Sequence, residues 1–162
     1  MSWVADPTTA IKCELIAEVA QTFGGVRLRV TGASMLPSIW PGDRLIVQRK
    51  PPNQIQPGQV ILYRRNSGVV AHRVIARRGD QFVTHGDCME HPDAPVHASE
   101  IVGEVVSVER EERRVAPEWT LWKQACAWAL RRSDFAVRAL LHWHCQSRRT
   151  VPLRTAPDFA TL

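Results

Sequence analysis

Lysine is scarce in this chain, and its cysteines form no recognisable pattern. Only three of the 21 basic residues are lysines, namely Lys12, Lys50 and Lys123. The spacings of the four cysteines match no disulfide framework and no zinc ribbon: Cys13, Cys88, Cys126 and Cys145. A chain of 162 residues buries enough surface to fold without such cross-links. We therefore expect free thiols and one domain with short appendages.

Long hydrophobic runs are also missing. No window of about 18 residues is free of charge, so the sequence predicts no transmembrane helix. The polar residues 2–10 lack the positive start and the apolar run of a secretory signal peptide. We expect a protein that is cytoplasmic or attached to a membrane only at its periphery.

Arginine carries most of the positive charge, which exceeds the negative charge by five. Half of the arginines lie beyond residue 109: Arg110, Arg113, Arg114, Arg131, Arg132, Arg138, Arg148, Arg149 and Arg154. Such a cluster forms either a solvated helix face or a surface that contacts phosphates or an anionic membrane. The sequence contains no DNA- or RNA-binding motif, so we do not expect nucleic acid as a partner.

The hydrophobic pattern predicts one helix followed by a series of strands. Asp6 and Pro7 are typical of a helix start, and Gly24 with Gly25 of a helix end. Between them, apolar residues recur at helical spacing: Ile11, Leu15, Ile16, Val19, Ala20 and Phe23. From residue 26 the period changes to two, and β-rich segments follow at residues 26–30, 44–48, 59–64, 68–76, 81–85 and 100–110.

A charged segment at residues 109–114 ends the β region. Two helical segments are expected after it. Pro117 opens the first, with apolar residues on one side at Trp119, Trp122, Cys126 and Leu130. Ser133 caps the second, which carries Val137, Leu140, Leu141 and His144. The fold class is therefore mainly β (α+β), with an N-terminal amphipathic helix (1–25), a compact β domain (26–110), a basic helical appendage (111–149) and a loose tail (150–162).

Ser34 and His72 are the first pair of residues that suggest chemistry. Ser34 lies in the turn of the stretch TGASMLPSIWPGDRLIV, between two predicted strands. A serine hydroxyl needs an adjacent base to become a nucleophile. His72 shares a strand face with Val70 and Val74, so its imidazole is expected to point inward or into a cleft. Each residue alone also has a structural explanation, Ser34 as a turn residue and His72 as a buried, hydrogen-bonded histidine.

Asp87 and Asp93 follow the last of the short strands, in the segment THGDCMEHPD. Either carboxylate is a candidate to accept the Nδ1 proton of His72, which would fix the tautomer of the ring. The alternative is that both aspartates only form Asx turns beside glycine and proline.

The segments GASMLP and PGDRLIV, followed by AHRVIARRGDQFVTHGD, resemble the signal peptidase I family of serine endopeptidases. The resemblance covers residues 31–108 and is closest to the branch of archaea and the endoplasmic reticulum. In the common bacterial branch a lysine heads a Lys-Arg-Val-Ile segment, and His72 stands at that position here. The resemblance implies an antiparallel β catalytic domain with Ser34 as nucleophile and His72 as general base. Asp87 and Asp93 reproduce the spacing of two aspartates in that branch.

The family implies a peptidase that cleaves a signal or leader peptide from a precursor protein, without a cofactor. None of the three lysines is placed to serve as the base, whereas histidine titrates near neutral pH. The backbone N–H of Ser34 is the expected oxyanion donor. Some family members add a hydroxyl two positions before the nucleophile, but this chain has Gly32 there.

Other interpretations remain open. A cluster of metal-ligand types occurs at His85, Cys88, His91 and His97, but its spacing fits no standard zinc site, so no bound metal is expected. A catalytically inactive β module that binds an extended peptide along a strand edge would carry the same β pattern. Self-cleaving repressors have a related serine turn, but one helix before the β domain supplies no helix-turn-helix.

The relation to a membrane has two interpretations. Members of the resembled family are usually held by spanning helices. In this chain the helices rich in tryptophan and arginine near the C-terminus either lie on a membrane surface or pack on the β domain.

Overall fold

The computed structural model describes residues 7–65, 68–111, 113–117, 120–131 and 142. Two helices, eight strands and two short 3₁₀ turns are present in these ranges. Their order is α1 (Pro7–Phe23), β1 (Gly25–Arg29), β2 (Arg44–Gln48), η1 (Pro52–Gln54), β3 (Val60–Arg65), β4 (Gly68–Arg78), β5 (Gln81–His85), β6 (Val96–His97), η2 (Ala98–Glu100), β7 (Ile101–Arg110), β8 (Arg113–Val115) and α2 (Leu121–Arg131).

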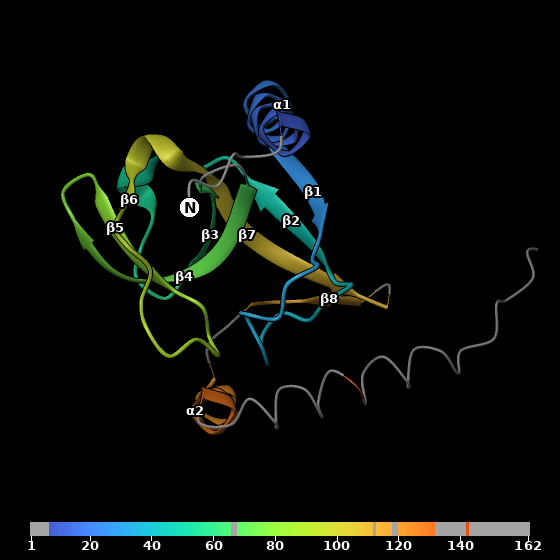
Figure 1. Cartoon of the computed structure of the whole chain (residues 1–162), viewed down its shortest axis with the longest axis vertical. Coiled ribbons are helices and arrows are strands. Elements are labelled where there is room, and N and C mark those ends of the chain that lie inside the picture. The colour runs from blue at the N-terminus through green and yellow to red at the C-terminus, as the bar shows by residue number, and fades with distance from the viewer. Residues whose placement is uncertain (1–6, 66–67, 112, 118–119, 132–141, 143–162) are drawn as a thin grey trace, which may run out of the picture.

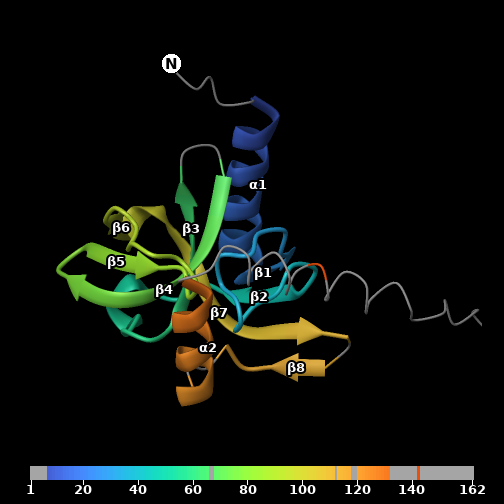
Figure 2. The ribbon, with the colours of Figure 1, turned by 60° about the horizontal axis from the view of Figure 1, so that its bottom comes forward.

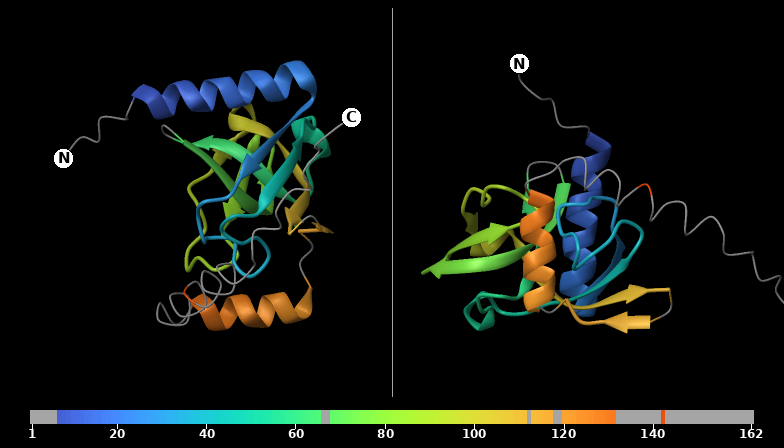
Figure 3. Two further views of the ribbon diagram at one scale, coloured as in Figure 1. Left: turned by 90° about the vertical axis from the view of Figure 1, so that its right-hand side faces the viewer. Right: turned by 90° about the horizontal axis from the view of Figure 1, so that it is seen from below.

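The strands form one sheet in which every pairing is antiparallel. Its order is β1-β2-β7-β3-β4-β5-β6, and β8 pairs with β7. Figure 1 shows the sheet coiling around itself, with α1 above it and α2 below it. Figure 2, in which the bottom of the molecule comes forward, brings α2 to the front, and the left panel of Figure 3 again shows α1 and α2 on opposite sides of the β region. The expected fold class, mainly antiparallel β with helices at both ends, is confirmed.

The six predicted strand segments correspond to β1, β2, β3, β4, β5 and β7, with ends that differ by two residues at most. Their alternating apolar residues build two hydrophobic clusters. One lies under α1 and contains Met35, Ile39 and the inner residues of β2, β3 and β7. The other contains Tyr63, Val74 and Phe82 and lies where β3, β4 and β5 meet. β6 and β8 had no predicted counterpart because two or three residues carry no readable period.

The face that α1 turns to the sheet differs from the predicted one. Cys13 and Ala20 are buried, with Ala17 partly buried between them, at spacings of four and three residues. Small side chains let the helix approach the sheet closely. Of the predicted apolar residues, Ile16 is partly buried and packs against the core cluster, whereas Ile11 is 64% exposed and Phe23 is 79% exposed.

The contact face of α2 also differs from the prediction. Lys123, Ala127 and Leu130 are buried, again at spacings of four and three residues. Trp122 and Cys126, which were expected on the same side as Leu130, are exposed. The spacing of apolar residues therefore did not identify the packed face of α2, because its exposed face also carries apolar residues.

Several predictions concern parts of the chain that the structure does not describe. The second C-terminal helix from Ser133 and the tail at residues 150–162 lie outside the described residues, as does Trp119. β8 continues the sheet beyond the boundary expected at residue 110. None of the helices in the described ranges has the length and apolar character needed to cross a membrane.

Candidate active site

Ser34 lies in a turn between β1 and β2 that hydrogen bonds close at its base. Val30 N–H donates to the carbonyl of Asp43 at 2.8 Å, and Gly42 N–H donates back to the carbonyl of Val30 at 2.8 Å. Gly42 has a φ of 91°, a conformation that glycine adopts without strain, as expected for the Pro-Gly-Asp turn. The serine is thereby held on a short, closed loop at the rim of the sheet.

The carboxylate of Asp43 supports this loop from inside. It is fully buried, accepts the N–H of Trp40 at 2.8 Å, and is paired with Arg110 of β7 at 2.7 Å. Arg110 also donates to the carbonyl of Ser38 at 3.4 Å. The loop that carries Ser34 is therefore tied to the far end of β7 by charge-assisted bonds.

His72 lies in the middle of β4 and is only 6% exposed. In the antiparallel register it pairs with Ile61 of β3, and Val74, two residues on, pairs with Thr84 of β5. Directly paired residues share a sheet face, so the imidazole stands between β3 and β5 on the side of Tyr63. The predicted inward orientation of His72 among its valines is confirmed.

The structure brings Ser34, His72 and Asp93 into one line of contacts. Oγ of Ser34 lies 2.8 Å from Nε2 of His72, across 38 positions of sequence. Nδ1 of His72 lies 2.7 Å from Oδ2 of Asp93. Both distances are within hydrogen-bond range for a nucleophile, a base and a group that orients the base.

The protonation state of Asp93 decides the direction of these bonds. Burial raises the pKa of Asp93, but hydrogen bonds from His72, Thr84 and Tyr63, together with the charge of His72, outweigh it and leave that pKa below its ordinary value. An ionised carboxylate only accepts hydrogen bonds, so Nδ1 of His72 donates to it. In the neutral imidazole Nε2 is then the free acceptor, and it faces the hydroxyl of Ser34.

Asp87 lies in the same loop as Asp93 but meets a different partner. Its two carboxylate oxygens accept from Nε and Nη2 of Arg73, at 2.8 and 2.7 Å. The side chains of Arg73 and Asp87 are 5% and 2% exposed. Arg73 also donates to the carbonyls of Gly58 and Pro117. Of the two candidate aspartates, the structure therefore brings Asp93 to Nδ1 of His72 and brings Asp87 to the neighbouring arginine.

Gly86 and Cys88 pack this loop against the serine. A Cβ placed on Gly86 would lie 2.5 Å from Cγ of Met89 and 2.9 Å from the carbonyl oxygen of Ser34, both too close, and 3.1 Å from Nε2 of His72, which is tight. Cys88 N–H donates to the carbonyl of Ser34 at 3.1 Å, and its thiol donates to the carbonyl of Ala33 at 3.1 Å. A glycine at residue 86 is what allows the close approach of the two loops.

Two residues that the sequence did not single out complete the surroundings of Asp93. Thr84 donates its hydroxyl to Oδ2 of Asp93 at 2.7 Å, and Tyr63 donates to the same oxygen at 3.2 Å. Both are buried, with exposures of 0% and 1%. The signal in the sequence was weak: Tyr63 is the only tyrosine of the chain and follows three apolar residues of β3.

A pocket of about 290 Å³ opens beside Ser34. The turn around Ser34 contributes Thr31, Gly32, Met35 and Ile39, and the strands contribute mainly aliphatic side chains from β1, β2, β3 and β4. The outer edge of β1 pairs with no other strand among the described residues, and neither does the edge of residues 68–72 that faces away from β3. Two strand edges therefore flank an apolar pocket that ends at the serine.

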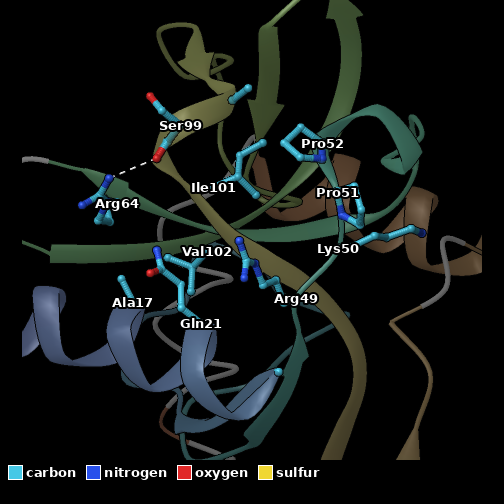
Figure 4. A pocket seen from close by; sticks show the side chains of 12 residues that line it. Ala17, Gln21, Arg49, Lys50, Pro51, Pro52, Arg64, Ser99, Ile101 and Val102 are labelled. Carbon is cyan, nitrogen blue, oxygen red and sulfur yellow. Dashed lines mark hydrogen bonds between the residues drawn. The ribbon is translucent and has the colours of Figure 1, made fainter.

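A second pocket, of about 550 Å³, lies between α1 and the sheet (Figure 4). Arg49, Arg64 and Gln21 line it above a floor that includes Ile101 and Val102. None of Ser34, His72 and Asp93 lines this second pocket.

Within the described ranges, no group of three or more His, Cys, Asp or Glu side chains is arranged to hold a metal ion. His97 accepts from the N–H of Ser99 and caps η2, while Cys88 contacts the serine loop. His97 and Cys88 therefore contact different parts of the chain.

Comparisons with known proteins identify the family to which the chain is similar. The family described as Peptidase S24-like matches residues 9–106, a range that includes Ser34, His72 and Asp93. The chain is 32% identical over 87 residues to proteins named inactive signal peptidase IA from Staphylococcus aureus strains Mu50, N315 and MW2. That match covers 52% of this chain and 50% of each relative, so the chain spans about half the length of the curated relatives it matches.

Proposed function

Because the chain belongs to the Peptidase S24-like family, we propose that it is a serine endopeptidase of the signal peptidase I type, which cleaves a signal or leader peptide from a precursor protein. The observation that carries this proposal is the line of contacts from Ser34 through His72 to Asp93, at 2.8 and 2.7 Å. Since a histidine faces the serine, the proposal assigns the chain to the Ser-His branch of the family.

The proposed reaction is acyl transfer to Ser34. As Oγ attacks the carbonyl carbon of the scissile peptide bond, Nε2 of His72 takes the hydroxyl proton. The C–N bond breaks, His72 passes this proton to the departing amine, and an ester to Ser34 remains. A water molecule then attacks the ester, with His72 again as the base, and Ser34 is restored. Asp93 keeps the Nδ1 proton in place and stabilises the imidazolium that forms at each attack.

The negative charge on the tetrahedral intermediate needs hydrogen-bond donors. We assign the backbone N–H of Ser34 to this role, because it belongs to the same residue as the attacking Oγ and therefore stays close to the carbonyl that Oγ attacks. Gly32 has no hydroxyl to contribute, so a further donor would be a backbone N–H or a side chain from another position.

The substrate is proposed to run as an extended strand between β1 and β4. Along the pocket beside Ser34 both strands have an edge that pairs with no strand among the described residues, and an added strand would pair with these edges. The walls of that pocket are aliphatic, with Leu28, Val69 and Ala71 among them. A small apolar side chain just before the scissile bond therefore fits best.

The test is incubation of the purified protein with a library of short peptides that carry small apolar residues, read by mass spectrometry. Ser34→Ala is the control, since it removes one oxygen and leaves the loop intact. We expect turnover to fall by about 10⁶-fold in this variant while its thermal unfolding stays unchanged. Cleavage by the variant at the rate of the parent protein would refute the assignment of the nucleophile.

A second candidate function is that of an inactive β module that binds an extended peptide. The observation that favours it is the name of the relatives above, which are described as inactive. The two functions differ in one outcome of the same experiment. An inactive module retains library peptides unchanged, and its retention is unaffected by Ser34→Ala, whereas a peptidase releases new termini.

We also propose that the exposed face of α2 makes peripheral contact with a membrane surface. Trp122 is 60% exposed and Trp128 is 59% exposed, with the small residue Ala125 between them. Flotation with anionic vesicles should recover the protein, and a Trp122→Ser/Trp128→Ser variant should float less. If the parent protein and the double variant float equally, α2 does not make the membrane contact.

A further inference from the structure

We propose that Thr84 and Tyr63 are positioning residues that hold Asp93 so that a single carboxylate oxygen serves His72. The inference rests on the proposed function for its catalytic consequence, but the geometry that motivates it does not. Oδ2 of Asp93 receives three donors, namely Nδ1 of His72 at 2.7 Å, Thr84 Oγ1 at 2.7 Å and Tyr63 OH at 3.2 Å.

Thr84 holds Asp93 at two points. Its carbonyl accepts the backbone N–H of Asp93 at 2.8 Å, while its hydroxyl donates to the carboxylate. The loop from residue 85 to residue 92 is thereby closed at its base by one residue of β5. A loop residue otherwise has free rotation about χ1, and the two bonds remove that freedom for Asp93. Because β5 is paired with β4, the carboxylate is held in register with His72.

Tyr63, in β3, is the third donor to Oδ2 of Asp93. It pairs with Val70 of β4, and its ring meets the ring of His72 edge-on at 6.4 Å between centroids. Its hydroxyl also lies 3.3 Å from Oγ1 of Thr84. The Thr84 hydroxyl has one proton, and the shorter contact to Asp93 takes it. Thr84 is therefore the principal donor, and Tyr63 the weaker, supporting one.

The consequence for the reaction is orientation of the base. An Asp93 carboxylate free to turn would leave Nδ1 of His72 without its acceptor for part of the time. The imidazole could then take the other tautomer, in which Nε2 carries a proton and does not accept one from Ser34. Thr84 acts through Asp93 and touches neither Ser34 nor the proposed substrate path, so its loss should lower kcat and leave KM almost unchanged.

Thr84→Val is the variant that tests this inference, because valine keeps the shape of threonine and removes only the hydroxyl donor. We expect kcat to fall about 10- to 100-fold, with KM within a factor of about three. Thr84→Ser keeps the donor and should restore most of kcat. Tyr63→Phe should cost only a few-fold, in line with its longer contact.

A spectroscopic readout keeps the test independent of peptide cleavage. The Nδ1 proton of His72, in a short bond to a carboxylate, should give a resonance far downfield in the proton NMR spectrum. This signal should be present in the parent protein and in Thr84→Ser, and weakened or shifted in Thr84→Val. Phe82→Leu is the matched packing control, since Phe82 is buried on the same face of β5 and has no bond to Asp93. It should lower thermal stability and leave the resonance in place.

The outcomes separate this inference from the proposed function. A parent protein that cleaves no peptide, yet loses the resonance in Thr84→Val, refutes the peptidase and supports the positioning role. Unchanged kcat and an unchanged resonance in Thr84→Val overturn the positioning role, as does an equal loss of resonance in Phe82→Leu. If Thr84→Val fails to fold, the same spectrum of Tyr63→Phe decides, and an identical signal in that variant counts against the inference.

Discussion

The loop after β5 carries two aspartates whose partners are neighbours on β4. Asp93 meets His72, and Asp87 meets Arg73, so the loop reaches both faces of the same strand. The side chain of Asp93 is 23% exposed and that of Asp87 is 2% exposed. One partner is a histidine that can gain and lose a proton, and the other is an arginine that keeps its charge at all working pH values.

This difference in partner suits Asp93 to catalysis and Asp87 to holding the fold together. The Asp93 side of the strand holds groups that can exchange protons with Ser34. The Asp87 side joins four parts of the chain through Arg73, because that arginine also reaches Ser38, Gly58 and Pro117. Substitution of one aspartate should therefore act mainly on activity, and substitution of the other mainly on the free energy of unfolding.

Among substitutions in the loop after β5, the largest effect on activity is expected from Asp93→Asn. The carboxamide has nearly the same shape, but it no longer forces Nδ1 of His72 to carry the proton. We expect kcat/KM to fall by about 10⁴-fold with peptide substrates, while the thermal unfolding midpoint moves little. A loss of only a few-fold would mean that Ser34 and His72 work without an orienting carboxylate.

Asp87→Ala should act on stability instead. The substitution leaves the buried guanidinium of Arg73 without its carboxylate, which costs about 3–5 kcal/mol in the free energy of unfolding. Urea titrations followed by tryptophan fluorescence measure the loss. The paired variant Arg73→Met/Asp87→Leu leaves no buried charge and should recover most of it. An Asp87→Ala protein as stable as the parent would contradict the supporting role.

Gly86→Ala tests the close packing of the loop after β5 against Ser34 and His72. A methyl group there must displace the side chain of Met89 and the carbonyl of Ser34, at 2.5 and 2.9 Å, and it crowds Nε2 of His72 at 3.1 Å. We expect kcat to fall about 100-fold from this misplacement. Gly79→Ala is the control, because a Cβ at residue 79 meets no atom within 4 Å. The φ of 58° at Gly79 strains an alanine and should lower stability, but the strain lies in the β4–β5 turn, so activity should be kept. Equal activities in the two variants would show that the close packing is not needed.

The smallest effect concerns the ionisation of Tyr63 beside Asp93. Burial, opposed by the hydrogen bond with Thr84 and aided by the nearby Asp93 charge, raises the pKa of Tyr63 to about 12. Its contribution to stability is complete below the unfolded value of about 10 and is lost as pH rises toward 12. Because the chain has one tyrosine, tyrosinate absorbance reports this residue alone. A native midpoint equal to that in urea would contradict the buried contact with Asp93.

Much of the fold follows from local patterns in the sequence. The alternation in residues 44–48 and 68–76 and the glycine turns at Gly42 and Gly58 are properties of a few adjacent residues. The helix faces were harder to predict, because large apolar residues such as Leu15 and Trp122 lie on the exposed sides of α1 and α2. In α1 the small residues Cys13 and Ala20 are buried, whereas in α2 Ala127 is buried together with Lys123 and Leu130.

The candidate site could be predicted only in part. Ser34 and His72 were found as a pair because each stands in a motif of a known family. Whether Asp87 or Asp93 pairs with His72 depends on which face of β4 each carboxylate reaches. The sequence of the loop does not specify these faces. The contributions of Thr84 and Tyr63 arise from the register of β3, β4 and β5, which brings three strands to one carboxylate oxygen. Such convergence has no signature in a single segment of sequence.

The most direct test of the account is the rate at which Ser34 reacts with a fluorophosphonate, which labels serines activated by a base. We expect one adduct, mapped to Ser34 by peptide mass spectrometry, and a rate that drops at least about 10³-fold in His72→Ala. An adduct at another residue, or a rate at Ser34 that does not depend on His72, would contradict the proposed nucleophile and base.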